Sequence, residues 1–272
     1  MVVFPNAKIN IGLRILHRRP DGFHNISTFF YPIPYKDILE IIPSHKLSFQ
    51  TSGLPIQGNK EDNLCLKAYH LLKTDYPQIP PFAIYLHKNI PMGAGLGGGS
   101  ADAAFILKAI NKKSGLKLNN KQLTHYATQL GSDCSFFIEN IPALAGGKGE
   151  VLQSISLNNL TGYQLLIVTP NNIAINTAQA YQNIQPQEEE IPLSQLIQKS
   201  ITSWKDNIKN DFETDIFKQH PILKEIKTSL YNQGAIYAAL SGSGSSIYGI
   251  FPDKINLRDF HFDVSTLKIF SL

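Results

Sequence analysis

The stretch from Pro91 to Ser100 reads Pro-Met-Gly-Ala-Gly-Leu-Gly-Gly-Gly-Ser and contains five glycines between positions 93 and 99. Glycines let a backbone approach an anion closely and point successive N–H groups at it. Residues 100–113, which follow directly, have the apolar spacing of a helix, and we expect Ser100 to cap it. The N-terminus of that helix adds the positive end of a dipole. The stretch therefore predicts a phosphate-binding loop, with a flexible turn as the alternative.

This loop is not one of the common nucleotide-binding motifs. The chain contains no G-x-x-x-x-G-K-[ST] pattern, which excludes a P-loop. The glycines at 93, 95 and 98 satisfy G-x-G-x-x-G. A dinucleotide fold also needs an acidic residue about 20 positions later, but Leu118 and Asn119 stand there. A protein kinase would carry His-Arg-Asp and Asp-Phe-Gly tripeptides, and neither occurs.

Strand and helix patterns extend outward from the loop. Residues 8–16 alternate strictly between Ile or Leu and Lys, Asn, Gly or Arg, which predicts a half-buried strand. Residues 82–90 form another predicted strand directly before the loop. Further strands are predicted over 164–169, 236–240 and 246–251, and further helices over 119–130 and 221–233. Because strands and helices mix without regular alternation, the pattern favours an α+β fold over a doubly wound sheet.

Length and composition limit the organisation of the chain. A length of 272 residues suggests about two domains, and 43% hydrophobic residues are enough for a packed core. We expect an N-terminal domain over residues 1–157 and a C-terminal domain over 158–272. The Gln- and Glu-rich stretch 182–200 is the best candidate for a mobile connection.

Charge and cysteine content narrow the classes of partner. The net charge is only +4, which suits a small anionic ligand better than a nucleic-acid groove. Two cysteines without a C-x-x-C pair exclude a disulfide framework and a Cys-based zinc site, and they fit a reducing compartment. No signal peptide and no apolar run of membrane-spanning length is visible. We expect a cytoplasmic protein with no nucleic-acid, membrane or obligate protein partner.

Three segments together resemble the motifs of the GHMP small-molecule kinases: Lys8–Leu13, Pro91–Ala101 and Ser241–Ser246. Arg19–His24 narrows the resemblance to the branch that phosphorylates the 2-hydroxyl of 4-diphosphocytidyl-2-C-methyl-D-erythritol in the non-mevalonate isoprenoid pathway. The resemblance extends from about residue 3 to about residue 252. It implies an α+β fold with an N-terminal ribosomal-S5-domain-2-like half and a C-terminal ferredoxin-like half. It also implies ATP as cosubstrate, with Mg²⁺ held through phosphates and without a protein cage.

The resemblance assigns the catalytic pair to Lys8 and Asp133. An aspartate can accept the proton of the attacking hydroxyl, and an adjacent ammonium offsets the developing charge. From the residues alone, Asp133 could instead cap a short helix after Gly131, and Lys8 could be a solvated lysine on its strand. The residues assigned to the nucleotide loop are Pro91, Met92, Gly93, Ala94, Gly95, Leu96, Gly97, Gly98, Gly99, Ser100 and Ala101.

The resemblance assigns substrate binding to Asn10, Phe23, His24, Thr177 and Tyr181. A cytosine ring needs an aromatic face and hydrogen-bond partners at its edge, and the Phe23-His24 pair offers both. The family usually has tyrosine at the position of Phe23, so this chain keeps the stacking surface and lacks the phenol. Phe23 and Tyr181 could also be ordinary core aromatics.

Two other functions remain open at this stage. One is a kinase of the same family that acts on homoserine, mevalonate or a sugar. The Phe23-His24 pair and Tyr181 favour a cytosine ring over these three substrates. The other is a catalytically silent module that binds RNA or a nucleotide. The presence of both Lys8 and Asp133, and the lack of a basic run with interleaved aromatics, speak against such a module.

Overall fold

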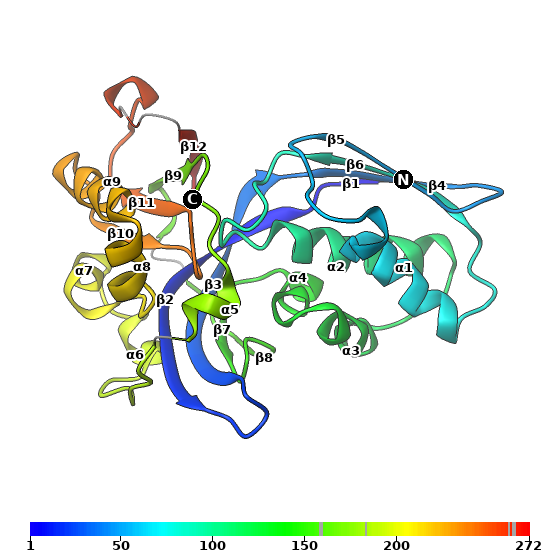
Figure 1. Ribbon diagram of the computed structural model, residues 1–272, viewed down its shortest axis with the longest axis horizontal. Coiled ribbons are helices and arrows are strands. Elements are labelled where there is room, and N and C mark those ends of the chain that lie inside the picture. The colour runs from blue at the N-terminus through cyan, green and yellow to red at the C-terminus, as the bar shows by residue number, and fades with distance from the viewer. Residues whose placement is uncertain (158–159, 183, 261, 263–264) are drawn as a thin grey trace. The chain divides into compact units, whose positions relative to one another are not determined.

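The computed structural model in Figure 1 describes residues 1–157, 160–182, 184–260, 262 and 265–272. These residues form two compact units, each assembled from separate segments of the chain. Unit 1 comprises Met1–Lys8, Pro34–Met92 and Gly97–Ile141, and unit 2 comprises Ile9–Ile33, Gly93–Leu96 and Pro142–Leu272. A single cut after residue 157 would not separate them, because both contain earlier residues. The division into domains at that cut stays a prediction, and residues 158 and 159 next to it lie outside the described residues.

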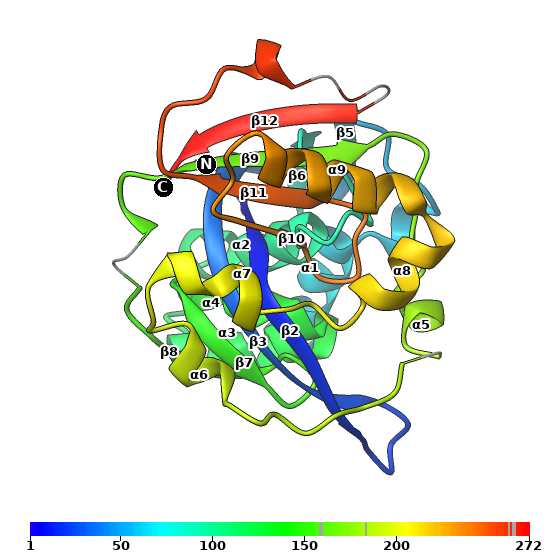
Figure 2. The same cartoon turned by 90° about the vertical axis from the view of Figure 1, so that its left-hand side faces the viewer.

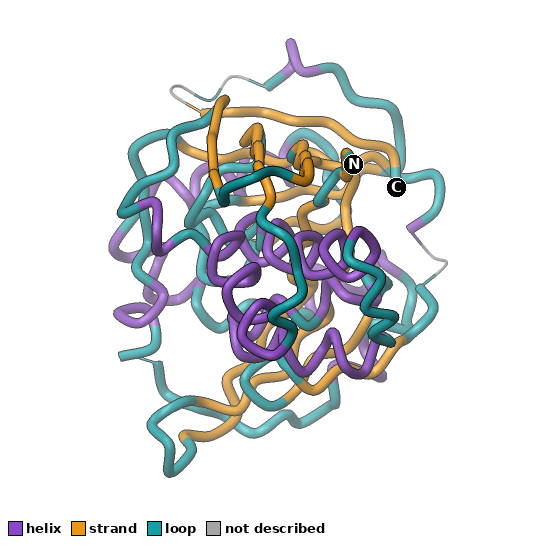
Figure 3. The backbone as a smooth tube through the Cα atoms, turned by 90° about the vertical axis from the view of Figure 1, so that its right-hand side faces the viewer, coloured by secondary structure: helices purple, strands orange, loops and turns teal. Residues whose placement is uncertain are grey.

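Unit 1 contains a four-stranded sheet with helices along one face (Figures 1 and 3). The strand order is β1-β4-β6-β5, in which β5 runs parallel to β6 and the other neighbours are antiparallel. The strands are β1 (Val2–Val3), β4 (Ile38–Pro43), β5 (Ser48–Gly53) and β6 (Phe82–Lys88). The helices are η1 (Lys60–Asp62), α1 (Leu64–Asp75), α2 (Gly98–Lys113), α3 (Asn120–Leu130), η2 (Ser132–Cys134) and α4 (Phe136–Glu139).

Unit 2 contains an antiparallel sheet in the order β10-β11-β9-β12, and α8 and α9 pack against it (Figure 2). A further sheet has the order β2-β3-β7-β8, and the ends of β2 and β3 extend into unit 1. The strands are β2 (Asn6–Arg18), β3 (His24–Lys36), β7 (Ala143–Gly146), β8 (Val151–Ser154), β9 (Gln164–Pro170), β10 (Tyr237–Leu240), β11 (Ile247–Phe251) and β12 (Ser265–Ser271). The helices are α5 (Thr177–Ala180), α6 (Leu193–Leu196), η4 (Ile201–Ser203), α7 (Trp204–Asn207), α8 (Glu213–Gln219), α9 (Pro221–Asn232) and η5 (Leu257–Asp259).

The helix after the glycine loop begins earlier than the sequence predicted. We expected Ser100 to cap it, but α2 starts at Gly98 and its N-cap is Gly97, with φ +71° and no side-chain capping bond. The left-handed backbone of Gly97 turns the chain into the helix, and no side chain caps the first N–H groups of α2. With 16 residues α2 is the longest described helix, and none in the described part of the chain is long and apolar enough to cross a membrane.

The strand that carries Lys8 and Asn10 is buried on both faces, so the prediction of a half-buried strand was wrong for its first half. Lys8 and Asn10 are each only 3% exposed. The polar groups tolerate burial because they have partners: the Asn10 side chain donates to Thr28 Oγ1 at 3.0 Å, and the Tyr248 hydroxyl donates to the Asn10 carbonyl at 2.7 Å.

The expected mobile connection over 182–200 is partly packed into unit 2. Leu193, Leu196 and Ile197 are buried, and α6 forms around them. The Gln187 amide also donates to the Ile15 carbonyl at 3.0 Å. The expectation of a mobile connection was therefore wrong for the segment around α6. The apolar side chains of this segment form a buried face, which its high content of Gln and Glu did not suggest. Asn183 lies outside the described residues.

Candidate active site

Lys8 and Asp133 form an ion pair in unit 1. The Lys8 Nζ lies 3.2 Å from Asp133 Oδ2, with the lysine side chain 4% exposed and the aspartate side chain 30% exposed. Lys8 is therefore not a solvated lysine. Asp133 lies inside η2, whose N-cap is Gly131, so its carboxylate does not cap that turn. A solvent-accessible carboxylate beside a buried ammonium can accept a proton from a hydroxyl that reaches it.

The beginning of α2 adjoins Lys8. A Cβ added at Gly97 would lie 3.1 Å from Lys8 Cε and 3.1 Å from the Phe137 ring. Ser100, the third residue of α2, lies close enough to Cys134, the neighbour of Asp133, to lower the pKa of its thiol slightly against the larger rise caused by burial. The structure thus brings both predicted catalytic residues to the helical end of the predicted phosphate loop.

The middle of the glycine loop belongs to unit 2, where it packs against residues 241–246. Gly95 has φ +76°, and a Cβ there would lie 1.8 Å from the Ser241 carbonyl oxygen. The Ser241 hydroxyl donates to the Gly95 carbonyl at 2.8 Å, and the Ser246 amide donates to the Ala94 carbonyl at 3.2 Å. The connection between β10 and β11 is therefore more than a hairpin turn, because it also fixes the backbone of the glycine loop.

The predicted substrate aromatics lie in unit 2. The rings of His24 and Tyr181 stack with centroids 5.2 Å apart and planes 12° apart. Phe23 is 57% exposed, and Lys148 Nζ lies 4.5 Å from the centroid of its ring. Burial lowers the pKa of His24, and the charge of Arg18 lowers it further, so the imidazole is neutral at pH 7. A neutral imidazole offers one hydrogen-bond donor and one acceptor.

The two remaining predicted substrate residues differ in how accessible they are. Asn10 is buried and its side-chain amide is engaged with Thr28. Thr177 is exposed at the first position of α5, with its hydroxyl 2.8 Å from the Ser243 hydroxyl. Thr177 can therefore reach a ligand directly, whereas Asn10 holds the strand in place.

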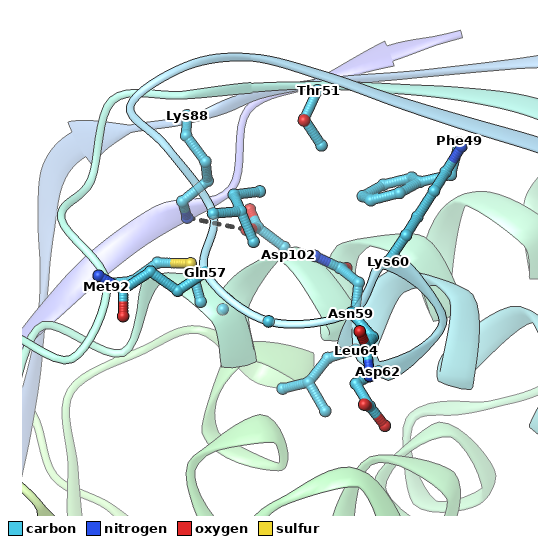
Figure 4. Close-up of a pocket in the computed structure, with 14 residues that line it drawn as sticks. Phe49, Thr51, Gln57, Asn59, Lys60, Asp62, Leu64, Lys88, Met92 and Asp102 are labelled. Atoms are coloured by element: carbon cyan, nitrogen blue, oxygen red, sulfur yellow. Dashed lines mark hydrogen bonds and ion pairs between the residues drawn. The ribbon is translucent and has the colours of Figure 1, made fainter.

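A cavity of about 320 Å³ lies within unit 1 beside the first turn of α2 (Figure 4). Met92 and Gly99 of the glycine loop contribute to its lining, as do Phe49 and Thr51 of β5 and the segment 56–64. The volume is in the range of small-ligand pockets. The glycine loop is thus placed at the wall of a cavity that can hold a nucleoside.

Three buried charged residues at this cavity or in contact with its lining were not predicted from the sequence: Asp37, Lys88 and Asp102. Lys88 and Asp102 line the cavity, and Asp37 contacts Lys88. The sequence pattern could have identified two of them, Lys88 and Asp102. The alternation of β6 places Lys88 on the buried face with Leu86, and Asp102 lies four residues before the buried Ile106 on the apolar side of α2. A charged residue at such a position indicates a buried partner.

Comparison with known proteins identifies the family of the chain. Residues 63–144 match the sequence family "GHMP kinases N terminal domain", and residues 193–260 match "GHMP kinases C terminal". A 4-diphosphocytidyl-2-C-methyl-D-erythritol kinase of Bacteroides fragilis is 49% identical over 266 residues, covering 96% of each chain. The protein of the same name from Cytophaga hutchinsonii is 46% identical over 268 residues, covering 98% of each chain.

Solved structures share the fold. A crystal structure of 4-(cytidine 5'-diphospho)-2C-methyl-D-erythritol kinase superimposes with a TM-score of 0.78 at 29% identity, covering 92% of this chain and 90% of that one. A mevalonate kinase superimposes with a TM-score of 0.72 at 15% identity, covering 99% of this chain and 98% of that one, which shows the shared α+β two-domain fold alone. With near-full-length relatives at almost half identity, the chain belongs to the 4-diphosphocytidyl-2-C-methyl-D-erythritol kinase family of the GHMP kinases.

Proposed function

We propose that this protein transfers the γ-phosphate of ATP to the 2-hydroxyl of 4-diphosphocytidyl-2-C-methyl-D-erythritol. The observation that carries the proposal is the Lys8–Asp133 ion pair beside Gly97, at the start of α2. Phosphoryl transfer needs little covalent chemistry from the protein and depends on positioning and charge stabilisation. A paired carboxylate and ammonium next to a phosphate-binding helix end supply both.

Asp133 and Lys8 divide the catalytic work. The partly exposed carboxylate of Asp133 accepts the proton of the attacking 2-hydroxyl as that oxygen bonds to the γ-phosphorus and the bond from the γ-phosphorus to the departing ADP breaks. The Lys8 ammonium, 3.2 Å away, orients that carboxylate and offsets the negative charge on the transferred group. Because Lys8 is almost completely buried, water screens its charge less than it would at the surface.

The nucleotide is assigned to the loop from Pro91 to Ala101 and to the 320 Å³ cavity beside it. Backbone N–H groups of the loop and the N-terminus of α2 bind the phosphates, and the cavity takes the adenosine. Ser100, the third residue of α2, would offer its hydroxyl to Mg²⁺, which would otherwise be held through phosphate oxygens and water. When bound, Mg²⁺ neutralises charge on the phosphates.

Unit 2 recognises the cytidyl group in this proposal. The stacked pair His24 and Tyr181 offers an aromatic face, and the neutral imidazole offers hydrogen bonds to the base edge. Phe23 adds an exposed ring that can also stack. Thr177 lies within hydrogen-bonding distance of Ser243, so two hydroxyls are available for polar groups of the substrate.

The test is Mg²⁺-dependent ADP release with a panel of acceptors. The panel contains 4-diphosphocytidyl-2-C-methyl-D-erythritol, 2-C-methylerythritol 4-phosphate, homoserine and mevalonate. We expect turnover only with the cytidyl compound. Turnover with another alcohol and not with this one would contradict the substrate assignment and leave the kinase chemistry in place.

The variants Asp133→Asn and Lys8→Met test the catalytic assignment. Each is expected to lower kcat by about 10²–10⁴-fold, the range for a positioned general base. Binding of MgADP is expected to survive in Asp133→Asn, because the loop and the cavity are unchanged. A folded Asp133→Asn protein with wild-type kcat would exclude Asp133 as the base.

A further inference from the structure

Asn210 is a buried polar residue of unit 2 outside the residues assigned to catalysis and binding. It lies between α7 and α8 and is 3% exposed. Its side-chain nitrogen donates to the Leu240 carbonyl at 2.8 Å and to the Gly242 carbonyl at 2.7 Å. Its side-chain oxygen accepts the Phe212 N–H at 3.0 Å. One side chain therefore bonds to the residues on both sides of Ser241.

The surroundings of the Asn210 side chain favour a carboxamide over other groups. Two carbonyl oxygens face its nitrogen and one backbone N–H faces its oxygen, which fixes the orientation of the amide. A carboxylate at this position has no N–H to donate to the two carbonyls. An apolar side chain would take these bonds away, and buried polar groups that lose a partner lower stability.

The backbone around Asn210 is paired with β2. The Leu13 amide donates to the Lys209 carbonyl at 3.0 Å, and the Asp211 amide donates to the Leu13 carbonyl at 2.9 Å. These bonds form a parallel bridge between Leu13 and Asn210. The side-chain amide of Asn210 therefore extends from a backbone that a long strand holds in place, so it can restrict the residues to which it bonds.

The residues that Asn210 holds contact the middle of the glycine loop, Gly93–Leu96 of unit 2. Ser241 is completely buried, and its hydroxyl donates to the Gly95 carbonyl at 2.8 Å. A Cβ added at Gly242 would lie 3.5 Å from the Cα of Gly95 and 3.5 Å from its carbonyl oxygen. Gly242 therefore packs directly on the backbone of the loop, beside the bond that Ser241 makes.

The bond to Gly242 distinguishes Asn210 from groups that hold only strand β10. Leu240, the last residue of β10, pairs with Ile247 of β11, and its N–H donates to Glu213 Oε1 at 2.9 Å. Gly242 lies beyond the end of that strand and has φ +57°. Loss of the Asn210 amide should therefore affect the β10–β11 connection more than the strand itself.

We propose that Asn210 is a positioning residue of the nucleotide site, which acts through Ser241 on the backbone of the glycine loop at Gly95. The proposal rests on the proposed ATP-dependent function, because it takes the ligand of the loop to be a nucleotide. The amide holds residues 240–242 where Gly95 keeps its φ of +76° and its bond to Ser241. Without the amide the loop must be ordered when the nucleotide binds, which weakens binding.

The first experiment compares the full-length wild type with Asn210→Ala, which removes the amide and adds no new group. Calorimetry measures the Kd of MgADP at a temperature at which circular dichroism shows both proteins folded. We expect the Kd to rise by about 5- to 150-fold, the range for energetic coupling between two sites of a protein. A lower Tm with the wild-type Kd would show that Asn210 is only a structural residue, and this would overturn the proposal.

The matched control is Tyr231→Phe. The Tyr231 hydroxyl donates to the Ala238 carbonyl and accepts the Ala238 N–H, both at 3.1 Å. This variant therefore also loses two hydrogen bonds to the backbone next to the loop connection, but Ala238 lies within β10. We expect a lower Tm and the wild-type Kd. If both variants raise the Kd equally, the Kd reports lost stability alone and the proposal is wrong.

A double-mutant cycle tests whether Asn210 acts through Ser241. Ser241→Ala removes the bond to the Gly95 carbonyl. If Asn210 acts through that bond, the rise in Kd of the double variant should be smaller than the product of the two single rises. Rises that multiply would show two independent effects and overturn the proposal. If Asn210→Ala does not fold, Asn210→Asp replaces it in both experiments, because it keeps the acceptor for Phe212 and loses the amide donors.

The outcomes separate this inference from the function on which it rests. A wild-type protein that binds MgADP, with an Asn210→Ala variant of equal Kd, contradicts the inference and leaves the kinase assignment standing. A folded wild-type protein that does not bind MgADP contradicts the proposed function itself.

Discussion

Replacing Gly95 by alanine tests whether the contact with Ser241 holds the nucleotide loop in its working shape. The added Cβ would lie 1.8 Å from the Ser241 carbonyl oxygen. Ordinary van der Waals separations are about 3.5 Å, so the two backbones must move apart by roughly 1.7 Å. That movement breaks the bonds from Ser241 Oγ to the Gly95 carbonyl and from the Ser246 amide to the Ala94 carbonyl.

The expected loss of stability follows from these contacts. Each hydrogen bond contributes about 1 kcal/mol net, and the left-handed backbone of Gly95 costs alanine about another 1–2 kcal/mol. The free energy of unfolding should fall by about 3–4 kcal/mol. The expected loss of activity is at least about 10²-fold in kcat/KM for ATP, because a displacement of about 1 Å has that effect on a positioned reactant.

Gly115→Ala is the matched control for this variant. Gly115 has φ +64°, similar to Gly95, but nothing lies within 4 Å of an added Cβ. In Gly115→Ala the free energy of unfolding should fall only by the cost of placing alanine in a left-handed conformation, about 1–2 kcal/mol. This corresponds to a drop of a few degrees in Tm, and the variant should keep full activity. Thermal unfolding and steady-state kinetics measure both variants. If Gly95→Ala unfolds at the temperature of Gly115→Ala and keeps its kcat/KM, the Ser241 contact does not position the loop.

Two further predictions concern the cytidyl half of the reaction. Tyr181→Ala should raise KM for the cytidyl substrate by about 5- to 150-fold, because one stacking interaction is lost, and it should leave KM for ATP unchanged. Tyr181→Phe keeps the ring and should have the wild-type KM. Equal KM values in wild type and both variants would show that Tyr181 does not contact the substrate. The lowered pKa of His24 means that the neutral ring predominates above its ordinary value of 6.5. KM for the cytidyl substrate should therefore stay constant above that pH and rise below it as the ring takes a proton and loses its acceptor; a profile that His24→Asn leaves unchanged would contradict this.

The sequence predicted the strands and helices around the loop because each has a clear local pattern. Residues 82–88 alternate as predicted, and α3 begins after Asn119, whose side chain forms a capping box with Gln122. The start of α2 was missed because a left-handed glycine, which leaves no side-chain pattern, replaces the expected serine cap. Local periodicity therefore predicts the elements better than their ends.

The site was predictable only in part, for a similar reason. Lys8 and Asp133 were assigned from a resemblance, and the structure brings them to 3.2 Å although 125 residues separate them in sequence. No local pattern predicts such a contact. Asp37 was missed because it stands alone between two strands, and only the fold shows that it accepts hydrogen bonds from the residues just before the glycine loop.

The interleaved segments of the two units have a consequence for synthesis of the chain. All residues of unit 1 have been made once residue 141 has been added, whereas unit 2 needs residues up to the C-terminus. The carbonyl of Asn10 receives its hydrogen bond from Tyr248, 238 residues later. The first residues of β2 therefore cannot form this hydrogen bond until Tyr248 has been synthesised. Contacts between residues so far apart in sequence slow folding. A chain truncated before β11 is expected to complete unit 1 but to leave unit 2 open to proteolysis.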